Sequence, residues 1–112
     1  MNTEHLDEDT LHELQLIMGD DFSRLVQTFT ADSVARIAAI RETATADDAE
    51  ALRRAAHSFK GSSGNMGARQ LSELCRLIEE YARDGSVDAC LPLIAALDDE
   101  FDVVQRELQR FH

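Results

Sequence analysis

The sequence contains little of what cross-links or stiffens a small protein. Its 112 residues include two cysteines, one proline and no tryptophan, and aromatic residues make up only 5%. Two cysteines are too few for a disulfide scaffold, and Cys75 and Cys90 lack the spacing of zinc ligands. We therefore expect both to be small buried residues in one domain covering 1–112, with a core filled mainly by aliphatic side chains.

Basic residues and long apolar runs are scarce as well. The 11 Lys and Arg stand against 22 Asp and Glu, which gives a formal net charge of −11. Such an excess of negative charge repels a phosphate backbone, so we expect no nucleic-acid partner. No apolar run approaches the roughly 20 residues that span a bilayer, and the N-terminus lacks the basic and apolar regions of a signal peptide. We expect a cytoplasmic protein without membrane contact.

Helical periodicity is what the sequence does contain. Apolar residues recur at three- and four-residue steps, and no stretch alternates as a strand would. Short connections between long amphipathic helices favour antiparallel neighbours, so we expect an all-α, up-and-down bundle. The pattern predicts a short first helix and four longer ones, over about 7–19, 20–43, 47–65, 68–84 and 86–108.

Capping residues mark several of the predicted helix ends. Asp7 can cap the first helix and Gly19 can end it. Asp47 and Glu50 are spaced like a capping box at the start of the third helix. In the fifth helix Pro92 would lie near the first turn, where a missing amide costs little.

Residues 57–68 combine signals that break a helix with signals that continue one. Glycine costs about 1 kcal/mol in a helix interior, and Ser-Gly pairs favour turns. The apolar stripe nevertheless continues in register through Leu52, Ala56, Phe59, Ser63 and Met66. We expect the helix to continue to residue 64 or 65, with Gly67 in the turn that follows.

The same helix gathers four chemically notable residues on another sector. At about 100° per residue, His57, Lys60, Gly61 and Gly64 fall together, roughly 130° from the apolar stripe. The glycines would leave the His57 ring uncovered and let another backbone approach. A neutral imidazole is a nucleophile near pH 7, and a lysine can neutralise phosphoryl oxygens. The spacing suggests a phosphoryl acceptor, although a lone surface histidine is more often inert.

Positive charge is concentrated around this sector. Residues 51–76 contain five bases and one acid, a net charge of +4, so the rest of the chain carries −15. The five bases are Arg53, Arg54, Lys60, Arg69 and Arg76. A basic patch on an acidic protein suggests an anionic group or an acidic partner. The alternative is that these bases are solvated residues paired with nearby acids.

Residues 56–68 read Ala-His-Ser-Phe-Lys-Gly-Ser-Ser-Gly-Asn-Met-Gly-Ala, which resembles the signature of histidine-containing phosphotransfer (HPt) domains. That signature is Ala-His-x-x-Lys-Gly-Ser-Ser or close to it, followed by an apolar residue and a glycine. The chain also has the length and helix order of a free-standing bacterial member. The resemblance implies a single HPt domain, a four-helix bundle with a short extra N-terminal helix.

The resemblance also implies a role for each residue of the motif. His57 would accept a phosphoryl group from the aspartyl phosphate of a receiver domain in a hybrid sensor histidine kinase, and would pass it to the receiver of a response regulator. Lys60 would neutralise the phosphate and Gly61 would permit docking. The receiver would supply Mg²⁺, so we expect no cofactor of this chain's own, no ATP site and a monomer.

The surrounding residues support a separate hypothesis about partner docking. We expect Gly64, Arg53, Arg54 and Arg69 to take part in docking, although the arginines do not belong to the motif. The acids at 47–48, 79–80 and 98–100 are interpreted as solvated faces. The histidines near the termini, His5, His12 and His112, form no i, i+4 pair, so we expect no metal site.

Three other functions fit the sequence less well. A dimeric histidine-kinase core places an acid directly after its histidine and a proline soon afterwards, whereas here Ser58 follows and no proline occurs before Pro92. An adaptor that binds a receiver without carrying phosphate would need neither His57 nor Lys60. A metal-carrying bundle would need inward-facing Glu-x-x-His pairs, which are absent.

Overall fold

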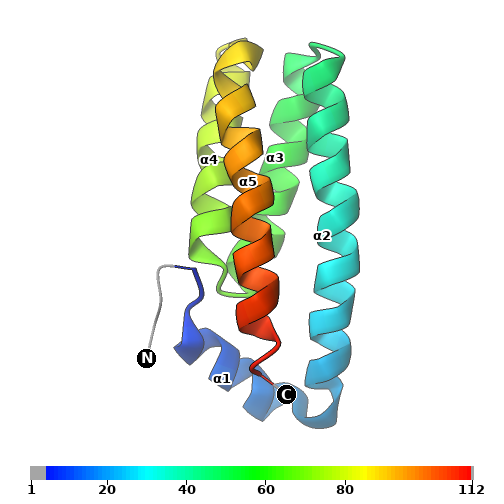
Figure 1. Ribbon diagram of the computed structural model, residues 1–112, viewed down its shortest axis with the longest axis vertical. Helices are drawn as coiled ribbons and strands as arrows, with labels where there is room; N and C mark the ends of the chain where they lie inside the picture. The colour runs from blue at the N-terminus through cyan, green and yellow to red at the C-terminus, as the bar shows by residue number, and fades with distance from the viewer. Residues whose placement is uncertain (1–4, 112) are drawn as a thin grey trace.

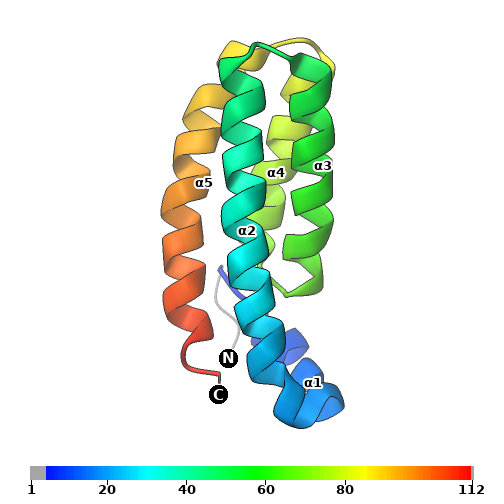
Figure 2. The same cartoon turned by 90° about the vertical axis from the view of Figure 1, so that its right-hand side faces the viewer.

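Helices account for most of residues 5–111, the part of the chain that the computed structural model describes (Figure 1). They are α1 (Glu8–Met18), the 3-10 helix η1 (Gly19–Asp21), α2 (Phe22–Thr45), α3 (Ala49–Asn65), α4 (Arg69–Arg83) and α5 (Val87–Leu108). Each of the helices α2 to α5 runs antiparallel to the one before it, along the 42 Å long axis of the molecule, and α1 lies across one end (Figures 1 and 2). The predicted all-α bundle with a short extra N-terminal helix is confirmed.

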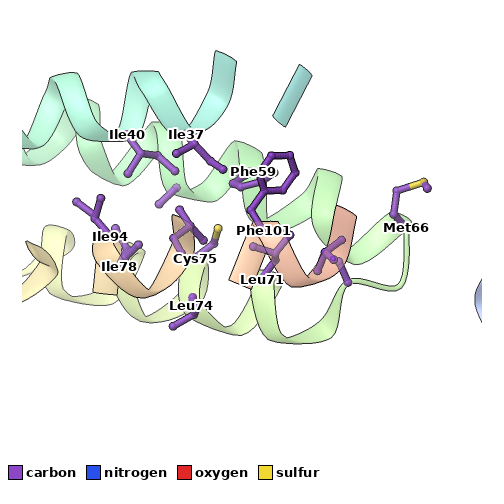
Figure 3. Close-up of a cluster of buried hydrophobic side chains, with 14 of the residues drawn as sticks. Ile37, Ile40, Phe59, Met66, Leu71, Leu74, Cys75, Ile78, Ile94 and Phe101 are labelled. Atoms are coloured by element: carbon purple, nitrogen blue, oxygen red, sulfur yellow. The ribbon is translucent and has the colours of Figure 1, made fainter. Parts of the chain in front are cut away.

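The core lies between the four long helices and is mainly aliphatic. In the close-up, Ile37 and Ile40 from α2, Phe59 from α3, and Leu71 and Ile78 from α4 face a common interior (Figure 3). Full burial of one such side chain stabilises the fold by about 1.5–3 kcal/mol. This apolar layer fixes the rotation of α3 and α4, and therefore decides which of their residues face outward.

Both cysteines are buried free thiols, as expected. Burial raises the pKa of the Cys75 thiol to about 12, so the thiolate, the reactive form, is not populated near neutral pH. Cys90 is also fully buried, and burial raises the pKa of its thiol too. The two residues fill space in the core.

The helix ends follow the capping signals with one shift. Asp7 caps α1 by accepting two backbone amides of its first turn, and Gly19 ends α1 with a φ of +55°. The expected capping box at Asp47 is wrong by one residue, because Asp48 caps α3 and accepts the amide of Ala51 at 3.1 Å. Asp47 instead adopts a φ of +54° in the turn, a conformation that aspartate tolerates better than most residues.

Pro92 also departs from expectation. Helix α5 begins at Val87, so Pro92 is its sixth residue and lies beyond the first turn. Its missing amide leaves the carbonyl of Asp88 without the usual helical donor. Both residues are exposed, so water can reach that carbonyl.

Candidate functional site

The motif lies on the second half of α3, which stays helical through its glycines. Phe59 and Ser63 are fully buried and hold this half of the helix against the bundle. The helix ends at Asn65, and Gly67 forms the turn with a φ of +73°, a conformation that favours glycine. Both features were predicted. The carbonyl of Gly67 accepts the amide of Asp7 at 2.8 Å, which joins the segment before α1 to this turn.

His57 lies at the surface and is held by a carboxylate from α4. Its side chain is 63% exposed, and its Nδ1 is 2.8 Å from Oε2 of Glu79. An ionised carboxylate only accepts hydrogen bonds, so in the neutral ring the proton is on Nδ1. Nε2 then carries the lone pair, and within residues 5–111 it makes no hydrogen bond. The geometry presents Nε2 as a nucleophile.

Glu79 is the centre of a small cluster of charges. Its side chain is only 5% exposed, and Oε1 accepts a hydrogen bond from Nζ of Lys60 at 2.7 Å. A guanidinium nitrogen of Arg83, one helical turn further along α4, is 3.6 Å from Oε2. Burial alone would raise the pKa of Glu79, but the hydrogen bonds from Lys60 and His57 outweigh it and hold this pKa below 4.5. The carboxylate is therefore ionised at neutral pH.

The sequence interpretation of Glu79 as a solvated residue is wrong. Glu79 is buried because it lies one turn after Cys75 and one turn before Ala82, on the same buried side of α4. That spacing was the available signal, because an acid in register with buried residues needs a partner. Its two firm partners, His57 and Lys60, come from α3 and are about 20 positions away in sequence.

A groove lies between α2 and α3, beside the His57–Lys60 segment of α3. Its lining includes the apolar side chains of Leu25 and Phe29 from α2 and of Met66, the residue that follows α3. Polar residues line it too, and Arg36 of α2 donates hydrogen bonds to Asp32 and to the hydroxyl of Ser58. The residue after the histidine thus connects α3 to α2, while the histidine itself contacts α4.

The two glycines of the motif have different surroundings. Gly61 lines the groove, and a Cβ built there would meet no atom within 4 Å. A Cβ at Gly64 would contact the hydroxyl of Ser72 at 3.6 Å, so this position faces α4. Gly61 is therefore the position where another molecule can come close to the α3 backbone beside His57.

The basic patch is partly paired with acids of the same chain. Arg53 forms an ion pair with Glu50 at 2.7 Å, and Arg76 pairs with two acids of α4, so the alternative interpretation holds for these two. Arg54 is exposed and makes no ion pair within residues 5–111. Arg69 is exposed at the first position of α4, beyond the end of α3. Eight residues separate His57 from that end, or about 12 Å of helix. A docking role for these arginines stays a prediction.

His5 and His12 lie at the end of the bundle near α1. The Nδ1 of His5 is 2.8 Å from Oε2 of Glu100, and the ring of His12 packs against Phe111. Glu100 is buried, so the expectation that residues 98–100 form a solvated face is wrong at this position. His112 lies outside the described residues. Within 5–111 no cluster of His, Cys, Asp or Glu is suited to a metal ion, and no helix is long and apolar enough to cross a membrane.

Comparison with known families agrees with the motif. A family model described as "Hpt domain" matches residues 24–107, which include all of α3 and α4 and nearly all of α2 and α5. The chain belongs to the Hpt domain family. His57, Lys60 and Glu79 all lie inside the matched range, whereas α1 precedes it. The family therefore accounts for the four-helix bundle, and α1 is the addition to this Hpt domain.

Individual relatives support the same assignment. The crystal structure of histidine-containing phosphotransfer protein B from Pseudomonas aeruginosa PAO1 is 40% identical, covers 99% of this chain and 100% of that one, and has a TM-score of 0.92. A rice structure assigned to the same class is 25% identical over 95% of this chain and 79% of that one, with a TM-score of 0.85. Histidine-containing phosphotransfer protein 4 of Arabidopsis thaliana is 33% identical over 55 residues, 49% of this chain and less than half (43%) of that protein.

Proposed function

We propose that this chain is a phosphocarrier of a two-component phosphorelay, with Nε2 of His57 as the phosphoryl acceptor. The donor is the aspartyl phosphate of a receiver domain in a hybrid sensor kinase, and the final acceptor is the aspartate of a response-regulator receiver. The observation that carries the proposal is the contact between Nδ1 of His57 and the buried carboxylate of Glu79. It leaves an unprotonated nitrogen on a ring that is 63% exposed.

The transfer balances without a proton being moved. The Nε2 lone pair forms the N–P bond while the P–O bond to the donor aspartate breaks and the carboxylate leaves. The ring keeps its Nδ1 proton and becomes a cation, which the ionised carboxylate of Glu79 stabilises. No general base is required, which fits the contact of Glu79 with Nδ1, the ring nitrogen that does not react.

Lys60 and the partner supply the remaining charge. Lys60 is positioned one turn after His57 to neutralise phosphoryl oxygens, and Mg²⁺ bound in the receiver's acidic pocket stabilises the transition state from the other side. We infer that the chain does not phosphorylate itself from ATP. Its glycines 61, 64 and 67 lie within and after a helix, unlike a phosphate-binding loop that follows a strand.

The groove between α2 and α3 supports the docking part of the proposal. Its apolar lining and the open position at Gly61 offer a surface next to the acceptor on which a receiver domain can pack. We infer that the chain acts as a monomer, since the transfer needs one exposed histidine and one partner. The free, buried thiols suit a reducing compartment, and we place the relay in the cytoplasm.

A labelling experiment tests the proposal. A receiver domain is charged with radiolabelled acetyl phosphate and Mg²⁺, freed of the reagent and mixed with the wild-type chain, with His57→Gln and with the matched control His12→Gln. We expect acid-labile, alkali-stable label on the wild type and on His12→Gln, and none on His57→Gln. Label that persists on His57→Gln would refute the acceptor assignment. Measurable binding to receivers with no label on the wild type would instead indicate a non-phosphorylated adaptor.

A further inference from the structure

Glu79 has a third basic neighbour, Arg83, that makes no hydrogen bond with it. Lys60 and His57 already contact its two oxygens at hydrogen-bonding distance, and Arg83 lies close to Oε2 at 3.6 Å without a hydrogen bond. An ion pair at that distance on an exposed side chain contributes little to stability. Arg83 therefore has no clear structural task in the unphosphorylated protein.

Phosphorylation changes the demand on Lys60. The phosphoryl group on Nε2 brings two negative charges to within reach of the ammonium, whereas Glu79 offers one charge that it shares with other cations. Lys60 is drawn toward the phosphoryl oxygens for this reason. The ring cation still faces Oε2 of Glu79, but the buried Oε1 loses the ammonium that donates to it, and a buried charged oxygen without a donor is unfavourable.

Resting on the proposed function, we propose that Arg83 is a positioning residue for the transfer. It becomes the counter-ion of Glu79 when Lys60 turns to the phosphoryl group, and it thereby releases Lys60 for that contact. A shift of less than about 1 Å brings the guanidinium to hydrogen-bonding distance. Its side chain is 60% exposed, so it has room to move.

The other arginines near Glu79 are committed elsewhere. Arg53 makes a two-point contact with Glu50, and Arg76 holds Glu73 and Glu80. Within residues 5–111, Arg83 forms a single ion pair, the one with Glu79. Arg83 is therefore the cation that can close on Glu79 without breaking another pair.

The charge balance of the cluster supports this role. Before transfer, Lys60 and Arg83 oppose Glu79, which leaves one positive charge. The transfer adds a ring cation and a doubly charged phosphoryl group, so the cluster becomes neutral. Without Arg83, the net charge of the cluster would change from zero to −1, next to a receiver whose aspartate becomes a free carboxylate in the same step. Arg83 thus favours the phosphorylated state of this chain.

The single lysine of the sequence makes the exchange directly observable. Lys60 is the only lysine, so labelling with ¹³C,¹⁵N-lysine gives one side-chain signal. The variants are Arg83→Gln, Arg83→Lys and the matched control Arg76→Gln, which lies on the same helix and pairs with other acids. Each is phosphorylated by a receiver domain that labels the wild type. We measure the Lys60 signal before and after transfer, and the equilibrium ratio of phosphorylated chain to phosphorylated receiver.

We expect Arg83→Gln to shift this ratio about threefold toward the receiver and to reduce the change in the Lys60 signal on phosphorylation to less than half. Arg83→Lys should restore both, and Arg76→Gln should match the wild type. In a Glu79→Gln background, Arg83→Gln should have no further effect on the ratio. Equal ratios for Arg83→Gln and Arg76→Gln, or a lowered melting temperature as the sole effect, would overturn the proposal. A wild type that no receiver labels would instead refute the proposed function.

Discussion

Replacing Glu79 by glutamine separates the charge of this side chain from its size. The amide oxygen can still accept a hydrogen bond from the Nδ1–H of His57. The amide nitrogen then faces the ammonium of Lys60, so that two hydrogen-bond donors face each other. The variant removes one charge from a side chain that is 5% exposed and changes no carbon atom of the core.

The expected cost in stability follows from the exposure of the partners. Removing one member of a fully buried ion pair costs about 3–5 kcal/mol. Here Lys60 is 32% exposed and His57 is 63% exposed, so water solvates both after the change. The variant also no longer buries a charge. We therefore expect a loss of about 1–2 kcal/mol, and a melting temperature lower by roughly 4–10 °C for a domain of this size.

The effect on transfer should exceed the effect on folding. The positive charge that develops on the ring loses its counter-ion, and a charge-assisted hydrogen bond contributes about 1.5–3 kcal/mol, which corresponds to a 10- to 150-fold slower transfer. Rapid-quench measurement with a phosphorylated receiver gives the rate, urea unfolding gives the stability, and Glu80→Gln is the control on the exposed side of α4. A folded Glu79→Gln variant that transfers at the wild-type rate would refute the reasoning.

Three further predictions concern acid, the glycines and the surface charge. The folded pKa of Glu79 lies below the unfolded value of about 4.5, so the stability that its carboxylate contributes is fully present above pH 4.5 and is lost as the pH falls through the folded pKa. In urea unfolding, the difference in free energy of unfolding between the wild type and Glu79→Gln should therefore shrink only below about pH 4.5. Gly67→Ala should lower the free energy of unfolding by about 2 kcal/mol, because the φ of Gly67 is +73° and a Cβ would lie 3.1 Å from a backbone oxygen of Asp7. Gly61→Ala should raise the stability to urea by up to about 1 kcal/mol, because a Cβ there meets no atom, and should slow the transfer if that surface docks the receiver. Arg54→Glu should slow association with the receiver at low salt and have less effect at high salt. Stopped-flow association rates of the variant that equal those of the wild type at low salt would exclude Arg54 from docking.

The sequence was sufficient for the fold because the apolar periodicity is consistent along the chain. Even at residues 57–65, where the glycines and serines favour a turn, Phe59 and Ser63 continue the stripe, and burial outweighs local propensity. The errors are local. Asp47 and Asp48 are both good caps, and the backbone of the turn decides between them. The position of Pro92 was misjudged because Ser86 and Asp88 could each begin α5, and the helix begins at Val87, which places Pro92 beyond the first turn.

The candidate site was predictable on α3 and not on α4. His57 and Lys60 could be placed together because both lie on one helix, whose period fixes their relative direction. Glu79 comes from another helix, and its contact with them depends on how α3 and α4 pack side by side. A count of charges pointed instead to the surface arginines. Two of these, Arg53 and Arg76, prove to be paired with acids on their own helices.

The charge that matters for transfer is therefore local, and the net charge of −11 gives little guide to it. A receiver presents an acidic pocket, and a uniformly acidic partner would be repelled from it. In this chain the exposed nitrogen of His57 lies in a cluster whose Lys60 and Arg83 outnumber its one acid. Because Glu79 is buried behind the ring, an approaching receiver meets the cations first, while the carboxylate acts on the ring from the side away from the incoming phosphoryl group. One buried acid thus orients the nucleophile without adding negative charge to the surface that must dock.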